Sequence, residues 1–369
     1  MTIVSLYDRP GGRGGVETVA QHLDVTLRQR GHRFVTVLAG PSYEDSAWEQ
    51  MLSHVHIGPV KSLSWKHLPS TLWPFAQFII RILRDENPDI VLINWAPMVI
   101  LLRILQKMGL IRSSFVVLVY EHGDLGRLKF VSPLYRWAYR TGLRQSNHVV
   151  CGGADYAAVL HRDYGVPVTA IGLALNLPAP LIARPASRMF HIVFVGRLRI
   201  EQKRVDRLLQ ACARLPRETS WTLQLIGDGP DRVMLENLAR TLKITDHCVW
   251  SGWQADPWAV IAQATLLAFP SDFEGFSAVM IEAMAHGLPV LATDCDFGPR
   301  GVIEDGVNGW LVERSDHAFA QQLGRLALGD ISIPSPETVA QTVARFSSDE
   351  VLERFLSVCH NTLHTSHRE

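Results

Sequence analysis

The chain alternates between short apolar runs and longer stretches in which apolar residues recur with helical spacing. Each short run has the length and composition of a buried strand. In the first half these runs are residues 3–6, 34–38, 88–93 and 115–120. A helical pattern follows the first run through Leu23 and Leu27 and stops at Gly31. Strands that alternate with helices predict a parallel sheet covered by helices.

The same alternation begins again after residues 176–188, which are rich in proline and alanine and are predicted to form a linker. Further strands are expected at residues 190–195, 221–226, 248–253, 266–270 and 289–292. Residues 306–312 indicate a tight hairpin-like turn.

We therefore predict two doubly wound α/β domains, at residues 1–175 and 189–345. The helical pattern within residues 346–369 has no strand after it. This helix could pack on either domain, and in one of these arrangements the chain returns to the first domain.

Length and composition agree with a two-domain globular protein. The 369 residues exceed the roughly 250–300 at which single hydrophobic cores stop growing. The hydrophobic fraction of 47% and charged fraction of 20% exclude a disordered chain. The net charge is zero, but residues 1–180 hold 18 Lys+Arg against 13 Asp+Glu, and the remainder holds 18 against 23. The two halves are thus expected to face different partners, or one of them an anionic surface.

The cysteines and the apolar stretches indicate a cytoplasmic protein, either soluble or peripheral to a membrane. The five cysteines lie far apart with no Cys-x-x-Cys pair, which excludes a disulfide scaffold and a zinc ribbon. The first residues lead directly into an apolar run, so no secretory signal is expected. The longest uncharged apolar stretch, residues 90–102, is too short to span a bilayer.

Residues 272–282, DFEGFSAVMIE, carry the densest set of chemical groups. Glu274 lies in an expected loop after a strand, and a helix is expected to begin near Ser277 and to end at Gly287. The free N–H groups and positive dipole of such a helix N-terminus suit phosphate. Taken alone, Glu274 and Glu282 could equally be ordinary helix charges.

Two further loops follow expected strands. The glycine-rich residues 10–15 precede a helix, but Glu17 stands at the last position of the dinucleotide fingerprint, so NAD and FAD are not expected. That loop could let the backbone approach a diphosphate, or it could be only a tight turn. In the second half, Gly196 and Arg197 lead to Lys203 across a strand-to-helix loop. Cations at such a loop are sensible phosphate partners.

His122 follows an expected strand of the first domain, at the edge where open α/β sheets bind ligands. A purely structural histidine is the alternative. Nearby, residues 127–144 interleave basic and aromatic side chains without one acid. Such a segment suits an anionic membrane surface, unless its aromatic residues point into the core. Its basic residues are Arg127, Lys129, Arg136, Arg140 and Arg144.

Taken in order, these motifs resemble those of family 4 glycosyltransferases. The correspondence runs nearly end to end, and its most specific part is the E-x7-E spacing of Glu274 and Glu282. The other matching motifs are GGVE at residues 14–17, Gly-Arg-Leu…Lys at residues 196–203, the IGDGP turn around Gly227, and VNGWLV at residues 307–312. The resemblance implies the GT-B fold, in which two Rossmann-like domains face a central cleft.

The resemblance also implies a role for each matched residue. Arg197 and Lys203 would neutralise the diphosphate of a nucleotide-sugar, Glu282 would hold the ribose, and Glu274 would contact the donor sugar. The catalytic residues would be Arg197, Lys203, Glu274 and His122, and His122 would lie beside the reacting sugar. The remaining donor-binding residues would be Gly14, Gly15, Gly196, Gly227, Trp253, Gly275, Phe276 and Ser277.

By the same resemblance, the enzyme would move a hexose or N-acetylhexosamine from a nucleotide-sugar, UDP-linked in the leading hypothesis. The acceptor would be a hydroxyl of a lipopolysaccharide, exopolysaccharide or lipid-linked glycan, held by the first domain, and the anomeric configuration would be retained. Three alternatives stay open: a nucleotide-sugar 2-epimerase, a sugar phosphorylase, and a non-catalytic nucleotide-sugar-binding subunit. Nucleic acid is not an expected partner, because the chain has neither a recognition motif nor a basic overall balance.

No cofactor or metal ion is expected. Two cations and a helix N-terminus can stabilise a departing diphosphate without a metal. Asp294 and Asp296 have the spacing of a metal clamp but are interpreted as part of a loop. One departure from the family pattern is Arg204, which stands where glycine is more usual and is expected to add positive charge beside the diphosphate.

Overall fold

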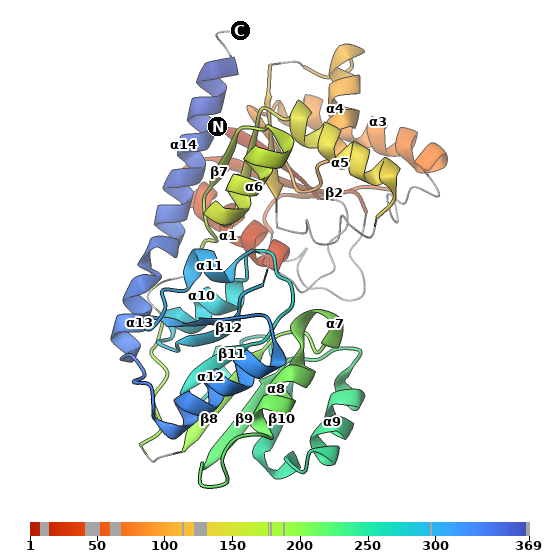
Figure 1. Cartoon of the computed structure of the whole chain (residues 1–369). Helices are drawn as coiled ribbons and strands as arrows, with labels where there is room; N and C mark the ends of the chain where they lie inside the picture. Colours follow the sequence, from red (N-terminus) through yellow and green to blue (C-terminus); the bar gives the residue numbers. More distant parts are fainter. Residues whose placement is uncertain are drawn as a thin grey trace. The chain divides into compact units, whose positions relative to one another are not determined.

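The computed structural model describes residues 1–7, 15–40, 52–59, 68–112, 114–121, 131–175, 177, 179–186, 189–295 and 297–366 (Figure 1). It contains two compact units. Unit 1 comprises Met1–Leu175 together with Ser348–Glu369, and unit 2 comprises Asn176–Ser347. Each unit is built around its own parallel sheet. None of the helices in the described ranges has both the length and the apolar character needed to cross a bilayer.

Unit 1 contains a parallel sheet in the order β3-β2-β1-β4-β5-β6-β7. The strands are β1 (Thr2–Tyr7), β2 (Arg33–Leu38), β3 (Val55–Ile57), β4 (Ile90–Ile93), β5 (Val116–Glu121), β6 (His148–Cys151) and β7 (Val168–Ala170). The helices between them are α1 (Gly15–Gln29), α3 (Leu68–Glu86), α4 (Met98–Lys107), α5 (Pro133–Gln145) and α6 (Ala154–Tyr164). The central strand β4 is apolar at every position, and its neighbours β1 and β5 are buried at every position but one, as expected when helices cover both faces of such a sheet.

The last helix, α14 (Ser348–Ser366), packs on α1 and β5 and so belongs to unit 1. It buries a stripe of side chains with helical spacing, among them Val351, Phe355 and Cys359. The backbone N–H of Ser348 donates to the Leu175 carbonyl oxygen at 3.0 Å, which joins the start of the helix to the end of the first segment.

Unit 2 contains a second parallel sheet, in the order β10-β9-β8-β11-β12-β13. Its strands are β8 (Phe190–Val195), β9 (Trp221–Ile226), β10 (Cys248–Gly252), β11 (Leu266–Phe269), β12 (Val290–Thr293) and β13 (Gly309–Val312). Its α-helices are α7 (Ile200–Lys203), α8 (Val205–Cys212), α9 (Arg232–Thr241), α10 (Ala278–Ala285), α11 (Pro299–Val302), α12 (Asp316–Leu328) and α13 (Pro336–Thr342). Short 3-10 helices lie at Thr245–His247, Trp258–Val260 and Ala344–Phe346.

Both sheets confirm the prediction of doubly wound α/β units, with one local correction. Residues 306–312 do not form a hairpin: the turn leads into β13, which pairs in parallel with β12 at the sheet edge. In each sheet the winding direction reverses beside the first strand, between β1 and β4 in unit 1 and between β8 and β11 in unit 2. Ligands of open α/β sheets bind outside the carboxyl ends of the strands at such a switch point.

Candidate functional site

The switch point of unit 2 brings together two of the predicted site residues. Lys203 ends the single-turn helix α7 after β8, and Glu274 lies in the loop after β11. The Lys203 Nζ lies 2.7 Å from Glu274 Oε1, and the two side chains are only 13% and 7% exposed. The same ammonium lies 5.2 Å from the centroid of the Phe269 ring. Charges this deeply buried are stable only when they are paired, so the two residues form one unit.

Two strand ends approach each other closely beside this ion pair. Gly227 follows β9, and a Cβ atom at that position would overlap the carbonyl oxygen of Gly196, which follows β8. A Cβ atom at Gly196 would in turn lie 3.6 Å from Lys203 Cε. Glycine at position 227 is therefore required by the contact between the strand ends.

The loop that carries Glu274 leads into α10. Ser277 precedes the helix, and its side chain makes no capping hydrogen bond. The first-turn N–H groups of a helix have no intrahelical partner, and they add to the positive end of the dipole. Gly298, with a φ of +95°, presses on this loop, since a Cβ atom there would lie 2.6 Å from the Gly275 carbonyl oxygen. The loop that contains Glu274 and the loop that contains Gly298 therefore pack against each other at the start of α10.

Glu282 lies within α10 and is half-buried. The Trp258 indole N–H donates to its Oε2 at 3.1 Å, and the indole stacks on the His286 ring with centroids 5.0 Å apart. Burial raises the pKa of Glu282, and the Trp258 hydrogen bond partly opposes that rise. Oε1 has no partner among the described residues, so it can accept a hydrogen bond from a ligand.

The other predicted residues of unit 2 lie at the same sheet edge without joining the ion pair. Arg197 is exposed, and its side chain makes no hydrogen bond or ion pair within the part of the chain that the structure describes. Trp253 follows β10 and is about half exposed. The Phe276 ring lies 5.7 Å from that of Phe346. Arg197 is thus a cation available to a ligand.

In unit 1 several predicted residues cannot be placed. Gly14, His122, Arg127 and Lys129 lie outside the described residues. Gly15 is the first residue of α1. The residue before His122, Glu121, accepts a hydrogen bond from the Tyr156 hydroxyl at 3.2 Å.

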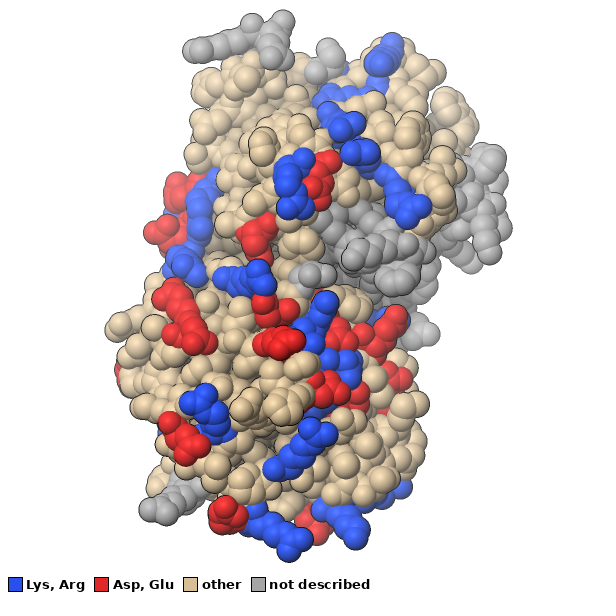
Figure 2. All heavy atoms as spheres, in the orientation of Figure 1, with Lys and Arg blue, Asp and Glu red and all other residues tan. Residues whose placement is uncertain are grey.

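Helix α5 presents a basic and partly apolar surface. Arg136, Arg140 and Arg144 are exposed, and so are Leu134 and Trp137, whereas the aromatic Tyr139 is buried. The expectation that the aromatic residues point into the core is thus right for Tyr139 and wrong for Trp137. Helices α4 and α5 contain no acidic residue. Figure 2 shows basic side chains over this part of unit 1, with few acidic ones near them.

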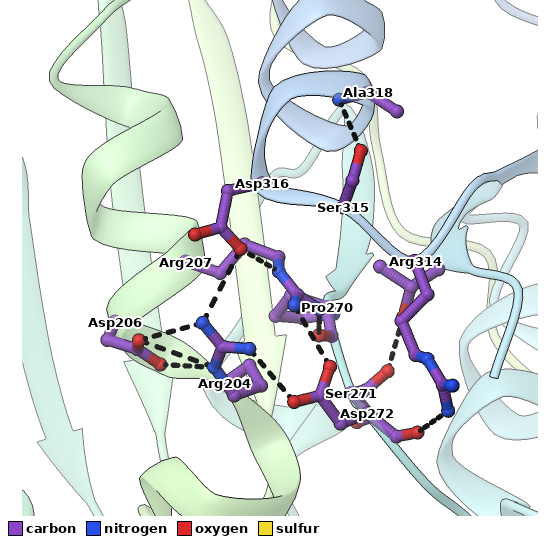
Figure 3. Close-up of polar contacts among 11 residues, drawn as sticks. Arg204, Asp206, Arg207, Pro270, Ser271, Asp272, Arg314, Ser315, Asp316 and Ala318 are labelled. Carbon is purple, nitrogen blue, oxygen red and sulfur yellow. Dashed lines mark hydrogen bonds and ion pairs between the residues drawn. The ribbon is translucent and has the colours of Figure 1, made fainter.

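Sequence reasoning missed a cluster of ion pairs beside Lys203 (Figure 3). Arg204, Arg207, Asp206, Asp272 and Asp316 form what we call the Arg/Asp network. The expectation that Arg204 adds free positive charge is wrong, because three aspartates contact its guanidinium group. Hydrogen bonds to Asp206 and Asp272 raise its pKa further above the ordinary arginine value.

The network and Trp258 gave no usable signal in the sequence. Arginine and aspartate at these spacings are also typical of solvated surfaces, and their meeting depends on how three segments pack. As for metals, no group of three or more His, Cys, Asp or Glu side chains in the described ranges could hold an ion. Asp294 forms an ion pair with Arg300, and Asp296 lies outside the described residues.

Two protein-family models match the chain. The model for Glycosyltransferase Family 4 covers residues 13–176, and that for Glycosyl transferases group 1 covers residues 190–328. The chain is 30% identical over 363 residues to the lipopolysaccharide core biosynthesis glycosyltransferase LpsE of Rhizobium meliloti, across 94% of this chain and 96% of that protein. It is 27% identical over 360 residues to a lipopolysaccharide 1,6-galactosyltransferase of Salmonella typhimurium, across 94% and 95%.

Solved structures give the same fold. The lipopolysaccharide outer core galactosyltransferase WaaB matches with a TM-score of 0.81 at 22% identity, over 99% of each chain. Anabaena Alr3699/HepE in complex with UDP matches with a TM-score of 0.80 at 18% identity, over 98% of this chain and 100% of that one. These matches confirm the predicted GT-B fold of two Rossmann-like domains.

Proposed function

The chain belongs to the family 4 (group 1) glycosyltransferases, and on that premise we propose that it transfers a hexose or N-acetylhexosamine from a UDP-linked donor to a hydroxyl of a lipopolysaccharide or other lipid-linked glycan. We further propose that unit 2 binds the donor, that unit 1 binds the acceptor, and that the anomeric configuration is retained. The observation that carries the proposal is the buried Lys203–Glu274 ion pair at the switch point, beside an uncapped helix N-terminus.

The diphosphate is assigned to Lys203, Arg197 and the first turn of α10. A lysine ammonium has three N–H donors, and the Glu274 contact uses one of them. No described residue engages the Arg197 guanidinium group in a hydrogen bond or ion pair, so all of its N–H donors can serve a ligand. As the sugar leaves, negative charge builds on the diphosphate, and prearranged cations and N–H groups stabilise that charge most. This arrangement supports departure of the nucleotide without a metal ion.

Glu274 and Glu282 take different parts of the donor in this proposal. Glu282 keeps one carboxylate oxygen for the ribose hydroxyls, while Trp258 holds the other. Glu274 is held by Lys203 and is assigned to the donor sugar. His122, outside the described residues, is proposed to lie near the reacting carbon.

The choice of donor, acceptor and location draws on the relatives. Structures of Anabaena Alr3699/HepE contain UDP and UDP-glucose. LpsE and the Salmonella typhimurium protein carry lipopolysaccharide in their names. A lipid-linked acceptor lies at a membrane, and the acid-free α4 and α5 with exposed Trp137 suit anionic head groups. We therefore propose a cytoplasmic protein that binds the membrane peripherally.

The test is a donor screen with the purified protein and truncated lipopolysaccharide. UDP-glucose, UDP-galactose, UDP-N-acetylglucosamine and GDP-mannose are supplied in turn, and nucleotide release and the glycan product are measured. We expect UDP release that requires acceptor, and an α-linked product from an α-linked donor. Acceptor-independent epimerised sugar or sugar phosphate would contradict the proposal in favour of a 2-epimerase or a phosphorylase.

The non-catalytic alternative has its own test. Lys203→Ala and Glu274→Gln are assayed separately, with circular dichroism to verify folding. A transferase of the proposed kind loses activity in both variants. Unchanged transfer by two folded variants would show that the site is assigned to the wrong residues.

A further inference from the structure

We propose that the Arg/Asp network holds Lys203 and Glu274 in position, so that Arg204 and Arg207 are positioning residues for the donor site. The inference rests on the proposed function, because it assumes that Lys203 and Glu274 bind the donor. It assigns a role to five charged side chains that are not among the predicted donor-binding residues, and Figure 3 shows how they lie.

Arg207 joins three elements of unit 2. It extends from α8, and its side chain is only 4% exposed. Its guanidinium lies 2.9 Å from Asp272 Oδ1 and 2.6 Å from Asp316 Oδ1, and it donates to the Pro270 carbonyl oxygen at 2.8 Å. Asp316 is the first residue of α12, where Ser315 caps the helix by accepting from the Ala318 N–H. Arg207 thus ties α8 and α12 to the loop after β11.

Arg204 contacts the other oxygen of the same carboxylate. Its Nη1 lies 2.9 Å from Asp272 Oδ2, while its other nitrogens lie 3.1 Å from Asp206 and 3.4 Å from Asp316. Each oxygen of Asp272 therefore contacts a different arginine. Charge-assisted contacts of this kind are strong and restrict the geometry of both partners.

The network connects to the donor site through the chain itself. Arg204 is the residue after Lys203, and Asp272 stands two residues before Glu274. The backbone reinforces the link, since the Asp272 N–H donates to the Gln202 carbonyl oxygen at 2.9 Å. A shift of Asp272 relative to Arg204 would therefore move Lys203 and Glu274 apart.

Charge and backbone geometry favour positioning over direct phosphate binding. Two arginines meet three aspartates, so the network has no cation left for an anion. Arg204 also has a φ of +46°, which favours glycine over a residue with a side chain. An arginine here bears that backbone strain, and its contacts with the aspartates offset the cost.

The test uses UDP affinity, measured by calorimetry without acceptor. Arg204→Gly relieves the backbone strain and removes the ion pairs, so the melting temperature should change by only a few degrees. UDP affinity should fall about tenfold, because Lys203 is no longer held. Arg204→Lys, which restores a cation, should recover part of the loss. Lys243→Gly is the matched control: Lys243 also has a positive φ, of 58°, and lies outside the network.

A double-mutant cycle distinguishes an effect on the position of Lys203 and Glu274 from a general loss of stability. In a Lys203→Ala/Glu274→Gln background, which leaves no buried charge unpaired, Arg204→Gly should have no further effect on UDP affinity. An effect that persists in that background, or an unchanged affinity for Arg204→Gly in the wild type, would overturn the inference. If the Lys203→Ala/Glu274→Gln protein itself binds UDP normally, the donor-site assignment fails, and the inference fails with it.

Discussion

The two sheets are wound in the same way, yet their switch points carry different side chains. In unit 2 the ends of β8 and β11 lead to Lys203 and Glu274, a buried ion pair backed by the Arg/Asp network. In unit 1 the corresponding end of β4 leads to Asn94, whose amide donates to the Ser5 hydroxyl at 3.1 Å. The next residue, Trp95, donates to the Tyr135 hydroxyl at 3.1 Å. These groups of unit 1 are neutral, whereas the described residues at the switch point of unit 2 include the cations Lys203 and Arg197.

Topology places a site in these two sheets, and side-chain chemistry selects its ligand. A doubly wound sheet opens a crevice at its switch point whatever residues lie there. Lysine and arginine at that point suit a nucleotide diphosphate, whereas amide, indole and hydroxyl groups suit the hydroxyls of a sugar acceptor.

The largest effect is expected from removing the ion pair of unit 2. Lys203→Ala combined with Glu274→Gln should lower kcat/KM for transfer by roughly 100-fold, the usual scale for losing a group that stabilises developing charge. Asn94→Ala in unit 1 is the matched change and should leave UDP affinity within about twofold, because no diphosphate contact is lost. Calorimetry with UDP and steady-state kinetics measure both. Equal losses of UDP affinity in the two variants would contradict the proposal that unit 2 binds the donor and unit 1 the acceptor.

A second prediction concerns the basic face of unit 1. Arg136→Ala with Arg140→Ala should weaken binding to vesicles of phosphatidylglycerol and phosphatidylcholine about 25-fold, since each basic residue contributes about 1 kcal/mol near an anionic surface. Co-sedimentation at low and high salt measures the effect, and salt should weaken wild-type binding as well.

The control for the membrane prediction lies in unit 2. Arg240 and Arg325 are exposed on α9 and α12, so Arg240→Ala with Arg325→Ala removes the same charge from the other unit. Vesicle binding of this protein should stay near the wild-type value. If the two double variants bind vesicles equally, α5 is an ordinary solvated face.

The smallest effect concerns the pH dependence of donor binding. Burial raises the pKa of Glu282, so this carboxyl takes up its proton at a higher pH than an exposed glutamate. A carboxylate accepts hydrogen bonds from ribose hydroxyls about twice as strongly as a neutral acid does, so UDP affinity should fall about fivefold as pH drops through this pKa. Glu282→Gln should flatten the profile, and 2′-deoxy-UDP should show a weaker dependence. A profile for Glu282→Gln identical to that of the wild type would refute the ribose assignment.

Protonation of Glu282 should affect the free energy of unfolding in the opposite direction to donor affinity. Because the folded protein holds the Glu282 proton more tightly than the unfolded chain, protonation favours the folded state. This contribution is fully present below the unfolded pKa and is lost as pH rises through the folded pKa. Chemical denaturation of wild type and Glu282→Gln across that range measures the difference. Donor affinity and this part of the stability therefore change in opposite directions with pH.

Much of the fold was predictable from the sequence because it depends on local patterns. Continuous apolar runs such as residues 190–195 mark strands that are buried on both faces, and they match β8 and its neighbours. The turn after residue 306 looked like a hairpin because glycine and asparagine favour both kinds of turn. Whether β13 pairs in parallel with β12 depends on a neighbour that is distant in sequence, so local pattern could not decide it.

The residue types available to a donor can be read from the amino-acid sequence alone: two glutamates at E-x7-E spacing, and the cations Arg197 and Lys203 at a strand-to-helix loop. Tertiary packing, in contrast, sets the pairing of Lys203 with Glu274, the hydrogen bond from Trp258 to Glu282, and the contacts of Arg204 with aspartates. These contacts join residues up to 112 positions apart. The partner of a charged side chain is set by which loops meet at the carboxyl edge of a sheet, and neither periodicity nor spacing encodes that meeting.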